Sequence, residues 1–260
     1  MSAIHRLSSV SPSQAHPQVL LEVCVDRLSD AHVAIEGGCD RLELCSALAL
    51  GGLTPSAAMM QQAAKLSVPV IALIRPCVGG FMMTGAELDV MCQDVAYARQ
   101  LGLAGVGVGV LDKNNRLDPT ATARLRDAAG DMEFVLIRAF DMTQDLVQAV
   151  EDAVALGFDR ILTSGSAPTA AEGADMLARL VQIAAARIEI LPGSGITAEN
   201  APDILTRTGA HSLHASCTTA HPATAREVSM GFAPAGGLRR TDAAKVRALR
   251  QAILAGRNDI

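Results

Sequence analysis

Short apolar runs alternate with longer stretches of helical spacing along almost the whole chain, and this alternation constrains the fold more than any other feature. The runs VLLEVCV at 19–25, RLELC at 41–45, VPVIALI at 68–74 and GVGVGVL at 105–111 have the length and the β-branched content of buried strands. A stretch of helical spacing follows each of them. Strand and helix repeated in this way predict an α/β fold with parallel strands.

A related phrase recurs where a helix is expected to pass into a strand. It reads EGGCDRLEL at 36–44, QLGLAGVGVGV at 100–110, ALGFDRILT at 155–163 and RTGAHSLHA at 207–215. Each copy has a glycine where the helix should end, which suits the positive φ of a helix C-cap. The recurrence indicates one repeated strand–helix unit.

Counting these units predicts eight strands and eight helices. The strands are expected near 19–25, 40–45, 68–74, 105–110, 133–138, 159–163, 187–191 and 211–215. The helices are expected near 29–37, 55–66, 85–101, 119–128, 144–155, 170–186, 197–207 and 241–255. Eight units of roughly 30 residues, with no composition break between the halves, favour a single closed (β/α)8 TIM barrel over a doubly wound open sheet.

Two segments do not fit the repeat. Residues 1–17 are rich in Ser, His, Pro and Gln without periodicity, so we expect a flexible N-terminal tail before a barrel domain at 18–260. The stretch 216–240 contains Gly and Pro and is expected to lack a helix. A loop of that length usually covers a site or meets another subunit.

Composition excludes several classes of function. The net charge is −5 and five Phe and one Tyr are the only aromatics, so neither a basic patch nor a stacking platform for nucleic acid is expected. The apolar run 68–74 is far shorter than the roughly 20 residues of a membrane span. The first eighteen residues lack a signal-peptide pattern, so we expect the six cysteines to be reduced in the cytoplasm.

The first two predicted strands both end in Glu-x-Cys. Glu22 precedes Cys24 and Glu43 precedes Cys45, and because side chains alternate along a strand, each pair should face the barrel interior. Two thiols on adjacent strands are plausible ligands for a soft ion such as Cu(I), although cysteine is also a common small core residue.

Carboxylates on the inner face of a barrel are costly to bury unless a cation pairs with them. We therefore expect Glu22 and Glu43 to pair with arginines such as Arg41, Arg75 or Arg138. Such pairs are either structural or part of a catalytic site.

Later strand ends carry groups that suit an anion. Arg75 follows the third strand, Arg138 and Asp141 follow the fifth, and Ser164 opens a turn after the sixth. The seventh strand runs into PGSGI, a glycine-rich turn before a helix, where barrels often bind phosphate. The predicted anion-binding residues are Arg75, Arg138, Ser164, Gly193, Ser194 and Gly195. Strand eight brings His214 and Cys217 beside strand one.

These strand ends, in this order, resemble the CutC family of copper homeostasis proteins. The matching phrases are LLEVCVD at 20–26, GGCDRLELCSAL at 37–48, GGLTPS at 51–56, IRP at 74–76, GVLD at 109–112, RAFDM at 138–142, ILTSG at 161–165, PGSGIT at 192–197 and HAS at 214–216. They cover about residues 19–217. The resemblance implies a barrel fold, a cytoplasmic location and a copper role, with Cys24 and Cys45 as the Cu(I)-binding thiols.

The chain departs from the family pattern at three positions. Ile137 stands where the family has His, Cys77 where it has Arg, and Gly80 where it has Asp. These changes remove groups that could perform acid–base chemistry in relatives. Cys77 adds a soft ligand and is a candidate third thiol.

Two functions from different classes follow. The first is a copper homeostasis protein that binds Cu(I) through Cys24 and Cys45, with Cys77 as a candidate third ligand. The second is an enzyme, or a degenerate one, acting on a small anionic or phosphorylated metabolite, with Glu22, Glu43 or Asp141 as acid or base. A blander alternative is that the family name records a genetic association without direct copper binding. A homodimer or homotetramer is expected.

Overall fold

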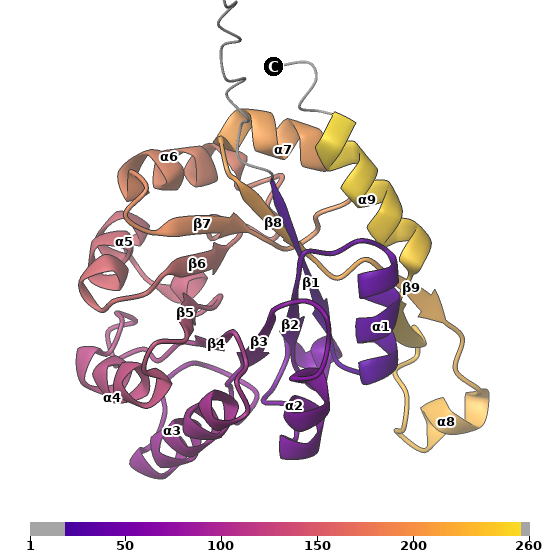
Figure 1. The fold of residues 1–260 in the computed structure, drawn as a ribbon, viewed down its shortest axis with the longest axis horizontal. Coiled ribbons are helices and arrows are strands. Elements are labelled where there is room, and N and C mark those ends of the chain that lie inside the picture. The colour runs from indigo at the N-terminus through magenta and orange to yellow at the C-terminus, as the bar shows by residue number, and fades with distance from the viewer. Residues whose placement is uncertain (1–18, 256–260) are drawn as a thin grey trace, which may run out of the picture.

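The computed structural model describes residues 19–255, so the tail predicted for residues 1–17 lies outside the described residues. Eight parallel strands form one sheet in the order β7-β6-β5-β4-β3-β2-β1-β8 (Figure 1). They are β1 (Leu20–Val25), β2 (Arg41–Leu44), β3 (Val70–Leu73), β4 (Gly105–Val108), β5 (Glu133–Leu136), β6 (Arg160–Thr163), β7 (Glu189–Pro192) and β8 (Ser212–Ala215). All eight predicted strands are confirmed.

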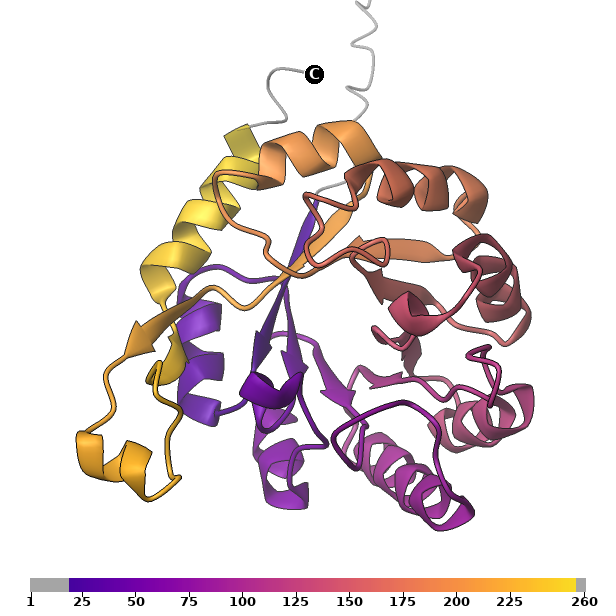
Figure 2. The same cartoon turned by 180° about the vertical axis from the view of Figure 1, so that it is seen from behind.

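The two ends of this order meet at a seam. β7 and β8 lie next to each other there, and the Ser212 hydroxyl donates a hydrogen bond to the Glu189 carboxylate across it. The helices form a ring around the outside of the sheet (Figures 1 and 2). The arrangement is a (β/α)8 barrel, as predicted.

The outer ring contains the eight predicted helices. They are α1 (Leu28–Glu36), α2 (Ala57–Ala63), α3 (Gly85–Gln100), α4 (Pro119–Ala129), α5 (Leu146–Ala155), α6 (Ala174–Ala184), α7 (Ala201–Thr208) and α9 (Ala243–Ala255), with short 3₁₀ turns at Leu48–Leu50 and Phe140–Met142. Local sequence sets several starts, since Thr84 and Glu87 form a capping box on α3 and Asp118 caps α4. Among the described helices, none is both long and apolar enough to cross a lipid bilayer.

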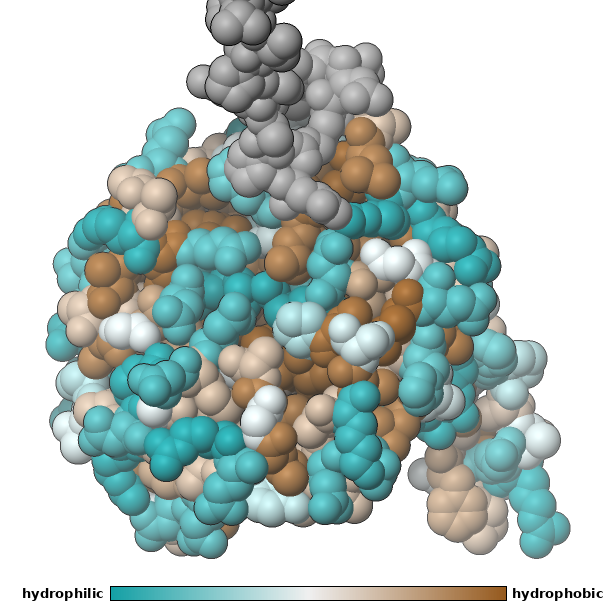
Figure 3. Space-filling model, viewed as in Figure 1, coloured by the Kyte–Doolittle hydropathy of each residue, from teal (hydrophilic) through white to brown (hydrophobic). Residues whose placement is uncertain are grey.

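The prediction that 216–240 lacks a helix is wrong. The segment forms β9 (Thr218–His221), the short helix α8 (Ala225–Ser229) and β10 (Leu238–Thr241), with β9 and β10 paired antiparallel. Thr224 and Glu227 form a capping box at the start of α8, and the T-x-x-E spacing was the sequence signal for it. The segment around α8 stands out from the rounded body of the protein (Figures 1 and 3).

The main apolar core lies between the sheet and the helices. Leu21, Val23 and Val25 of β1 belong to it, whereas Glu22 and Cys24 alternate with them on the inner side of the barrel. The predicted inward direction of Glu22 and Cys24 is thereby confirmed, and polar side chains occupy the barrel interior.

Gly105 of β4 offers a test of how tightly the barrel interior is packed. A Cβ there would lie 2.6 Å from the carbonyl oxygen of Glu133 and 2.7 Å from Cδ1 of Ile71. We expect Gly105→Ala to lower the free energy of unfolding in urea by about 1–3 kcal/mol, since the neighbours are backbone and a packed side chain. Gly85→Ala is the control because its Cβ would meet nothing within 4 Å. Equal stability of both variants would contradict the expected packing.

Candidate functional site

A cavity of about 520 Å³ opens at the carboxyl ends of the barrel strands. Its volume lies within the range of about 300–1,000 Å³ that is usual for small-molecule sites. Residues of β1, β2, β3, β6 and β8 line it, together with the loops after β5 and β7 and the first half of α9. Its ionisable wall residues are Cys24, Glu43, Arg75, Arg138, Glu199, His214, Cys217, Arg239 and Lys245.

Three buried side chains meet at the bottom of this cavity. Cys24, Glu43 and His214 each offer one ligand atom, and these atoms all lie within 4.8 Å of one another. Strand register explains the meeting, because Cys24 lies level with Glu43 on β2, and Glu22 lies level with His214 on β8. We call these three residues the floor cluster.

Glu22 lies beneath the floor cluster and fixes its histidine. The carboxylate accepts a hydrogen bond from Arg41 Nε, and His214 Nδ1 lies 2.7 Å from its other oxygen. The predicted pairing of Glu22 with Arg41 is confirmed. With Nδ1 donating to the carboxylate, His214 turns Nε2 toward the floor cluster, where it lies 3.9 Å from Glu43 Oε2.

The two interior carboxyls have opposite pKa shifts. Burial raises the pKa of Glu22, but Arg41 and His214 outweigh it and lower the pKa to about 2. Burial also raises the pKa of Glu43, and with only a partial offset from His214 the result is about 7. Glu22 is therefore ionised at neutral pH while Glu43 titrates there.

His214 carries the positive charge of the floor cluster. Burial lowers its pKa, but Cys24, Glu43 and Glu22 together raise it well above the ordinary value. Its charge therefore depends on Cys24 and Glu43 as well as on Glu22, the carboxyl that orients its ring.

Cys45 and Cys77 lie outside the floor cluster. Cys45 is fully buried in the apolar core, where its Sγ donates to the carbonyl oxygen of Val25 at 3.5 Å. Gly52 packs over it, so that a Cβ on Gly52 would approach Cys45 Sγ to 3.6 Å. Cys77 lies on the loop after β3, with its Sγ 3.6 Å from Glu87 Oε1. Neither cysteine lines the cavity.

Cys217 is the second thiol that lines the cavity with Cys24. It has a φ of 48°, a left-handed conformation that is uncommon outside glycine. Burial, followed by the neighbouring Cys24, raises the pKa of its thiol to about 12. The sequence placed this residue beside strand one but assigned it no role.

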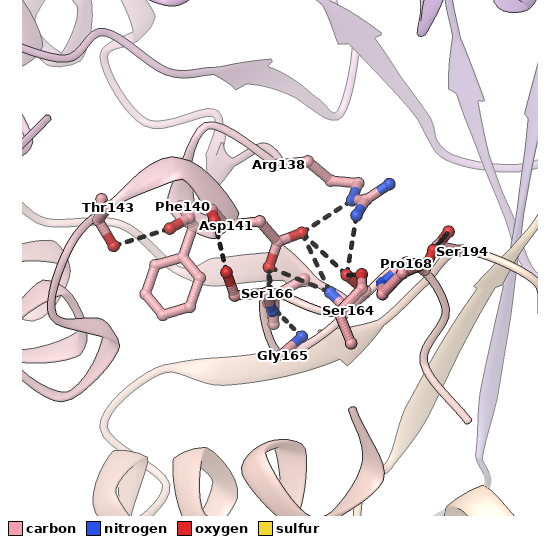
Figure 4. A network of polar contacts seen from close by, with 11 residues as sticks. Arg138, Phe140, Asp141, Thr143, Ser164, Gly165, Ser166, Pro168 and Ser194 are labelled. Atoms are coloured by element: carbon pink, nitrogen blue, oxygen red, sulfur yellow. Dashed lines mark hydrogen bonds and ion pairs between the residues drawn. The ribbon is translucent and has the colours of Figure 1, made fainter. Parts of the chain in front are cut away.

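The turn after β6 binds an internal carboxylate (Figure 4). Asp141 accepts hydrogen bonds from the amides of Ser164 and Ser166 at 3.2 and 3.0 Å, from the Thr163 hydroxyl, and from Arg138 Nε at 2.8 Å. Ser164 was expected to bind an external anion and Asp141 to act as acid or base. Asp141 instead takes the donors of this turn, and neither residue lines the cavity.

Arg138 and Arg75 both line the cavity, as their predicted role requires. Arg138 is partly engaged by Asp141 and by Ser164 Oγ at 2.8 Å. Arg75 is 8% exposed, and its guanidinium donates only to carbonyl oxygens, those of Leu50, Gly52 and Gly79. Its Nε has no partner among the described residues.

The glycine-rich turn after β7 divides into an internal and an exposed part. The Gly193 amide donates to the Thr163 carbonyl at 2.9 Å and does not line the cavity. Ser194 and Gly195 do line it. Arg239 and Lys245 also line the cavity. Sequence reasoning missed both, because Arg239 lies within the segment that it read as a loop and Lys245 comes shortly after it.

A sequence model of the CutC family matches residues 19–219. The chain belongs to the CutC family. It is 49% identical over 234 residues to a CutC family protein of Sinorhizobium medicae, with 90% of this chain and 95% of that protein covered. A CutC family protein of Aliivibrio fischeri is 41% identical over 244 residues, with 90% and 99% covered.

Solved structures agree with this assignment. The proposed copper homeostasis protein CutC of Streptococcus agalactiae is 34% identical with a TM-score of 0.73, over 76% of this chain and 99% of that chain. Thiamine phosphate pyrophosphorylase of Pyrococcus furiosus is 14% identical with a TM-score of 0.59, over 92% of this chain and 96% of that chain. The second likeness shows the barrel fold alone.

The buried pair of Glu22 and Arg41 should be a major determinant of stability in this CutC family member. We expect Arg41→Met to lower the free energy of unfolding by about 3–5 kcal/mol, because it leaves a carboxylate buried with fewer partners. The double variant Glu22→Leu/Arg41→Met should recover part of the loss, since it removes the unpaired charge. Urea unfolding at pH 7 measures both. If the double variant is no more stable than Arg41→Met, the lost stability comes from packing and not from the unpaired charge.

Glu43 should make the CutC fold less stable as the pH rises. Its folded pKa of about 7 lies above the ordinary 4.5, so its contribution is fully present below pH 4.5 and is lost as the pH rises through 7. The loss can reach about 1.4 kcal/mol per pH unit. Glu43→Gln cannot ionise, so the wild type should lose stability relative to it between pH 5 and pH 8. The exposed Glu36→Gln is the control, and the same pH dependence in all three proteins would contradict the raised pKa.

Proposed function

We propose that this CutC family member binds a copper ion at the floor cluster. The observation that carries the proposal is the position of three ligand atoms, from Cys24, Glu43 and His214, within 4.8 Å of one another in a buried site. Bringing together a thiol, an imidazole and a carboxyl on three neighbouring strands costs desolvation, which a bound cation offsets.

The orientation of His214 supports a metal. Histidine ligands commonly donate the second ring nitrogen to a carboxylate, which fixes the ring and makes the free nitrogen a better ligand. Glu22 accepts from Nδ1 in this way, and Arg41 holds Glu22 from the other side. The free Nε2 faces the Cys24 and Glu43 side chains.

The donor set fits copper. Thiolate sulfur favours Cu(I), and imidazole suits copper in either oxidation state, while a carboxylate is the weakest of the three donors for a soft ion. The proposed copper homeostasis role of the Streptococcus agalactiae relative supports copper as the ion. Zinc shares these donor preferences and is therefore the competing ion in the test.

The proposed ligand set differs from the thiol pair that family resemblance implies. Cys24 is common to both sets, but Cys45 would have to leave its contact with the Val25 carbonyl and move from beneath Gly52. Cys217 lines the cavity with Cys24 and needs no such rearrangement of the core. The pair of Cys24 and Cys45, with or without Cys77, stays a prediction.

Anaerobic competition titration with Cu(I) tests the proposal. We expect one tight site, weakened at least tenfold by Cys24→Ser, or by about 1.4 kcal/mol, because serine offers a hard oxygen in place of a soft sulfur. Cys45→Ser should leave the affinity unchanged. Cys92→Ser is the matched control, since Cys92 lies on α3 and does not line the cavity. A parallel Zn(II) titration shows which ion the site prefers.

X-ray absorption at the copper edge provides a direct readout of the ligands. One sulfur with nitrogen or oxygen scatterers is expected from the floor cluster. Two sulfur scatterers, together with weaker binding by Cys45→Ser, would identify the thiol pair as the site and overturn the floor cluster. Equal Cu(I) affinity in every variant would show that these thiols bind no copper.

The size of the cavity favours a second candidate function, that of an enzyme or degenerate enzyme acting on a small anionic metabolite. A single ion at the floor would leave most of the 520 Å³ unfilled. Glu43 is 7% exposed, faces this space and accepts no hydrogen bond from the described residues, which leaves it free to exchange a proton with a bound compound. Arg75 supplies positive charge on another wall.

A further inference from the structure

Three consecutive amides on the cavity wall have no acceptor in the described part of the chain. The N–H groups of Ser194, Gly195 and Ile196 donate no hydrogen bond to any residue in 19–255, whereas the amides on either side, of Gly193 and Thr197, are both engaged. The φ angles of Ser194 and Gly195 are 77° and 73°. Successive free amides in a turn form a concave site for an anion.

A second loop with free amides lines the same cavity. The N–H groups of Ser216 and Cys217 likewise donate to no residue in the described part of the chain. We call residues 194–196 and 216–217, which follow β7 and β8, the rim loops. Loops after the seventh and eighth strands are a frequent phosphate site in barrels of this fold.

Lys245 adds a full positive charge beside the rim loops. Its ammonium donates to the Thr218 carbonyl oxygen at 2.8 Å, directly after the second loop, and has no carboxylate within 4 Å among residues 19–255. The pKa of the exposed Glu199 is lowered, mainly by a hydrogen bond from Thr197 and to a smaller extent by the charge of Lys245. Two donor hydrogens of the ammonium remain for a ligand.

Two buried groups point independently to a ligand in the cavity. Arg75 is 92% buried, has an unpartnered Nε and has no carboxylate within 4 Å in the described chain. A guanidinium buried without an opposite charge is costly, and an anion in the cavity would reduce that cost. Glu43 is 93% buried and accepts no hydrogen bond from residues 19–255, so a ligand that carries a hydroxyl would suit it.

The charges on the wall agree with an anionic ligand. The cations are Arg75, Arg138, Arg239 and Lys245, and the carboxyls are Glu43 and Glu199. The excess of positive over negative side chains on the wall therefore favours a ligand with more than one negative charge.

We propose that the rim loops and Lys245 bind the phosphate group of a small hydroxylated phosphate monoester, whose hydroxyl reaches Glu43. The proposal rests on the second candidate function, and it names the substrate class of that site. Clustered amides and an ammonium suit the three terminal oxygens of a phosphate, and a carboxylate would leave part of this donor set unused.

Amide chemical shifts of the ¹⁵N-labelled, metal-free protein test the site with four probes. These are glycerol 3-phosphate, glycerate, glycerol and inorganic phosphate. Glycerol 3-phosphate should shift the rim-loop amides and that of Gly107, where a Cβ would lie 3.8 Å from Glu43 Oε1. Inorganic phosphate should shift the rim loops alone, and glycerol should shift neither.

Matched lysine variants test whether the positive charge of Lys245 contributes to phosphate binding. Lys245→Gln should weaken glycerol 3-phosphate binding about tenfold, since it removes a charge-assisted hydrogen bond. Lys65→Gln should have no effect, because Lys65 is bonded only to Gln62 on the exposed surface of α2. Equal binding of Lys245→Gln and wild type would overturn the assigned role of Lys245.

The remaining outcomes separate this proposal from the function on which it rests. If glycerate binds as tightly as glycerol 3-phosphate, the site takes small anions but the phosphate subsite is wrong. If shifts appear only at residues away from the rim loops, the assigned location is wrong. If none of the four probes binds, both the phosphate subsite and the small-anion function are wrong. The copper proposal is tested separately by the Cu(I) titration.

Discussion

The rest of the site depends on the two hydrogen bonds that Glu22 makes, one with Arg41 and one with His214. This arrangement places an ionised carboxylate at the centre of the barrel, where the charge would be unstable without both partners. It also fixes the ring of His214, and so decides which nitrogen faces Cys24 and Glu43. Glu43, in contrast, forms no ion pair with an arginine among the described residues. Two glutamates in one barrel interior therefore have different protonation states at the same pH.

Strand register explains what the sequence could and could not predict about the floor cluster. Apolar periodicity and the Glu-x-Cys repeat located the strands and the inward faces. They suggested that the two thiols lie together, because each occupies the same position in its own strand. The register between β1 and β2 sets Cys24 against Glu43 instead, with Cys45 two residues further along in the core. Register depends on the stagger of the whole barrel, which neither strand encodes alone.

The anion-binding residues illustrate a second limit of sequence reasoning. From residue type and position in the sequence, Ser164, Arg75 and Ser194 were equally good candidates for binding an anion. Asp141 occupies the turn at Ser164, whereas the amide of Ser194 has no acceptor in the described chain. Whether a donor is already used inside the protein is decided by tertiary contacts between distant loops. The same holds for Lys245, which reaches the cavity only because β9 and β10 return α9 to the barrel mouth.

The two proposed ligands use different parts of one cavity and meet at Glu43. An ion at the floor needs Cys24, His214 and one oxygen of Glu43, while a phosphate at the rim needs none of them. The hydroxyl of a phosphorylated ligand would reach the other oxygen of the same carboxyl. Ile137, which also lines the wall and is 5% exposed, is apolar and offers Glu43 no hydrogen bond. Electrostatic contacts with Glu43 are strengthened by this apolar wall, so whichever ligand binds first alters the charge that the second one meets.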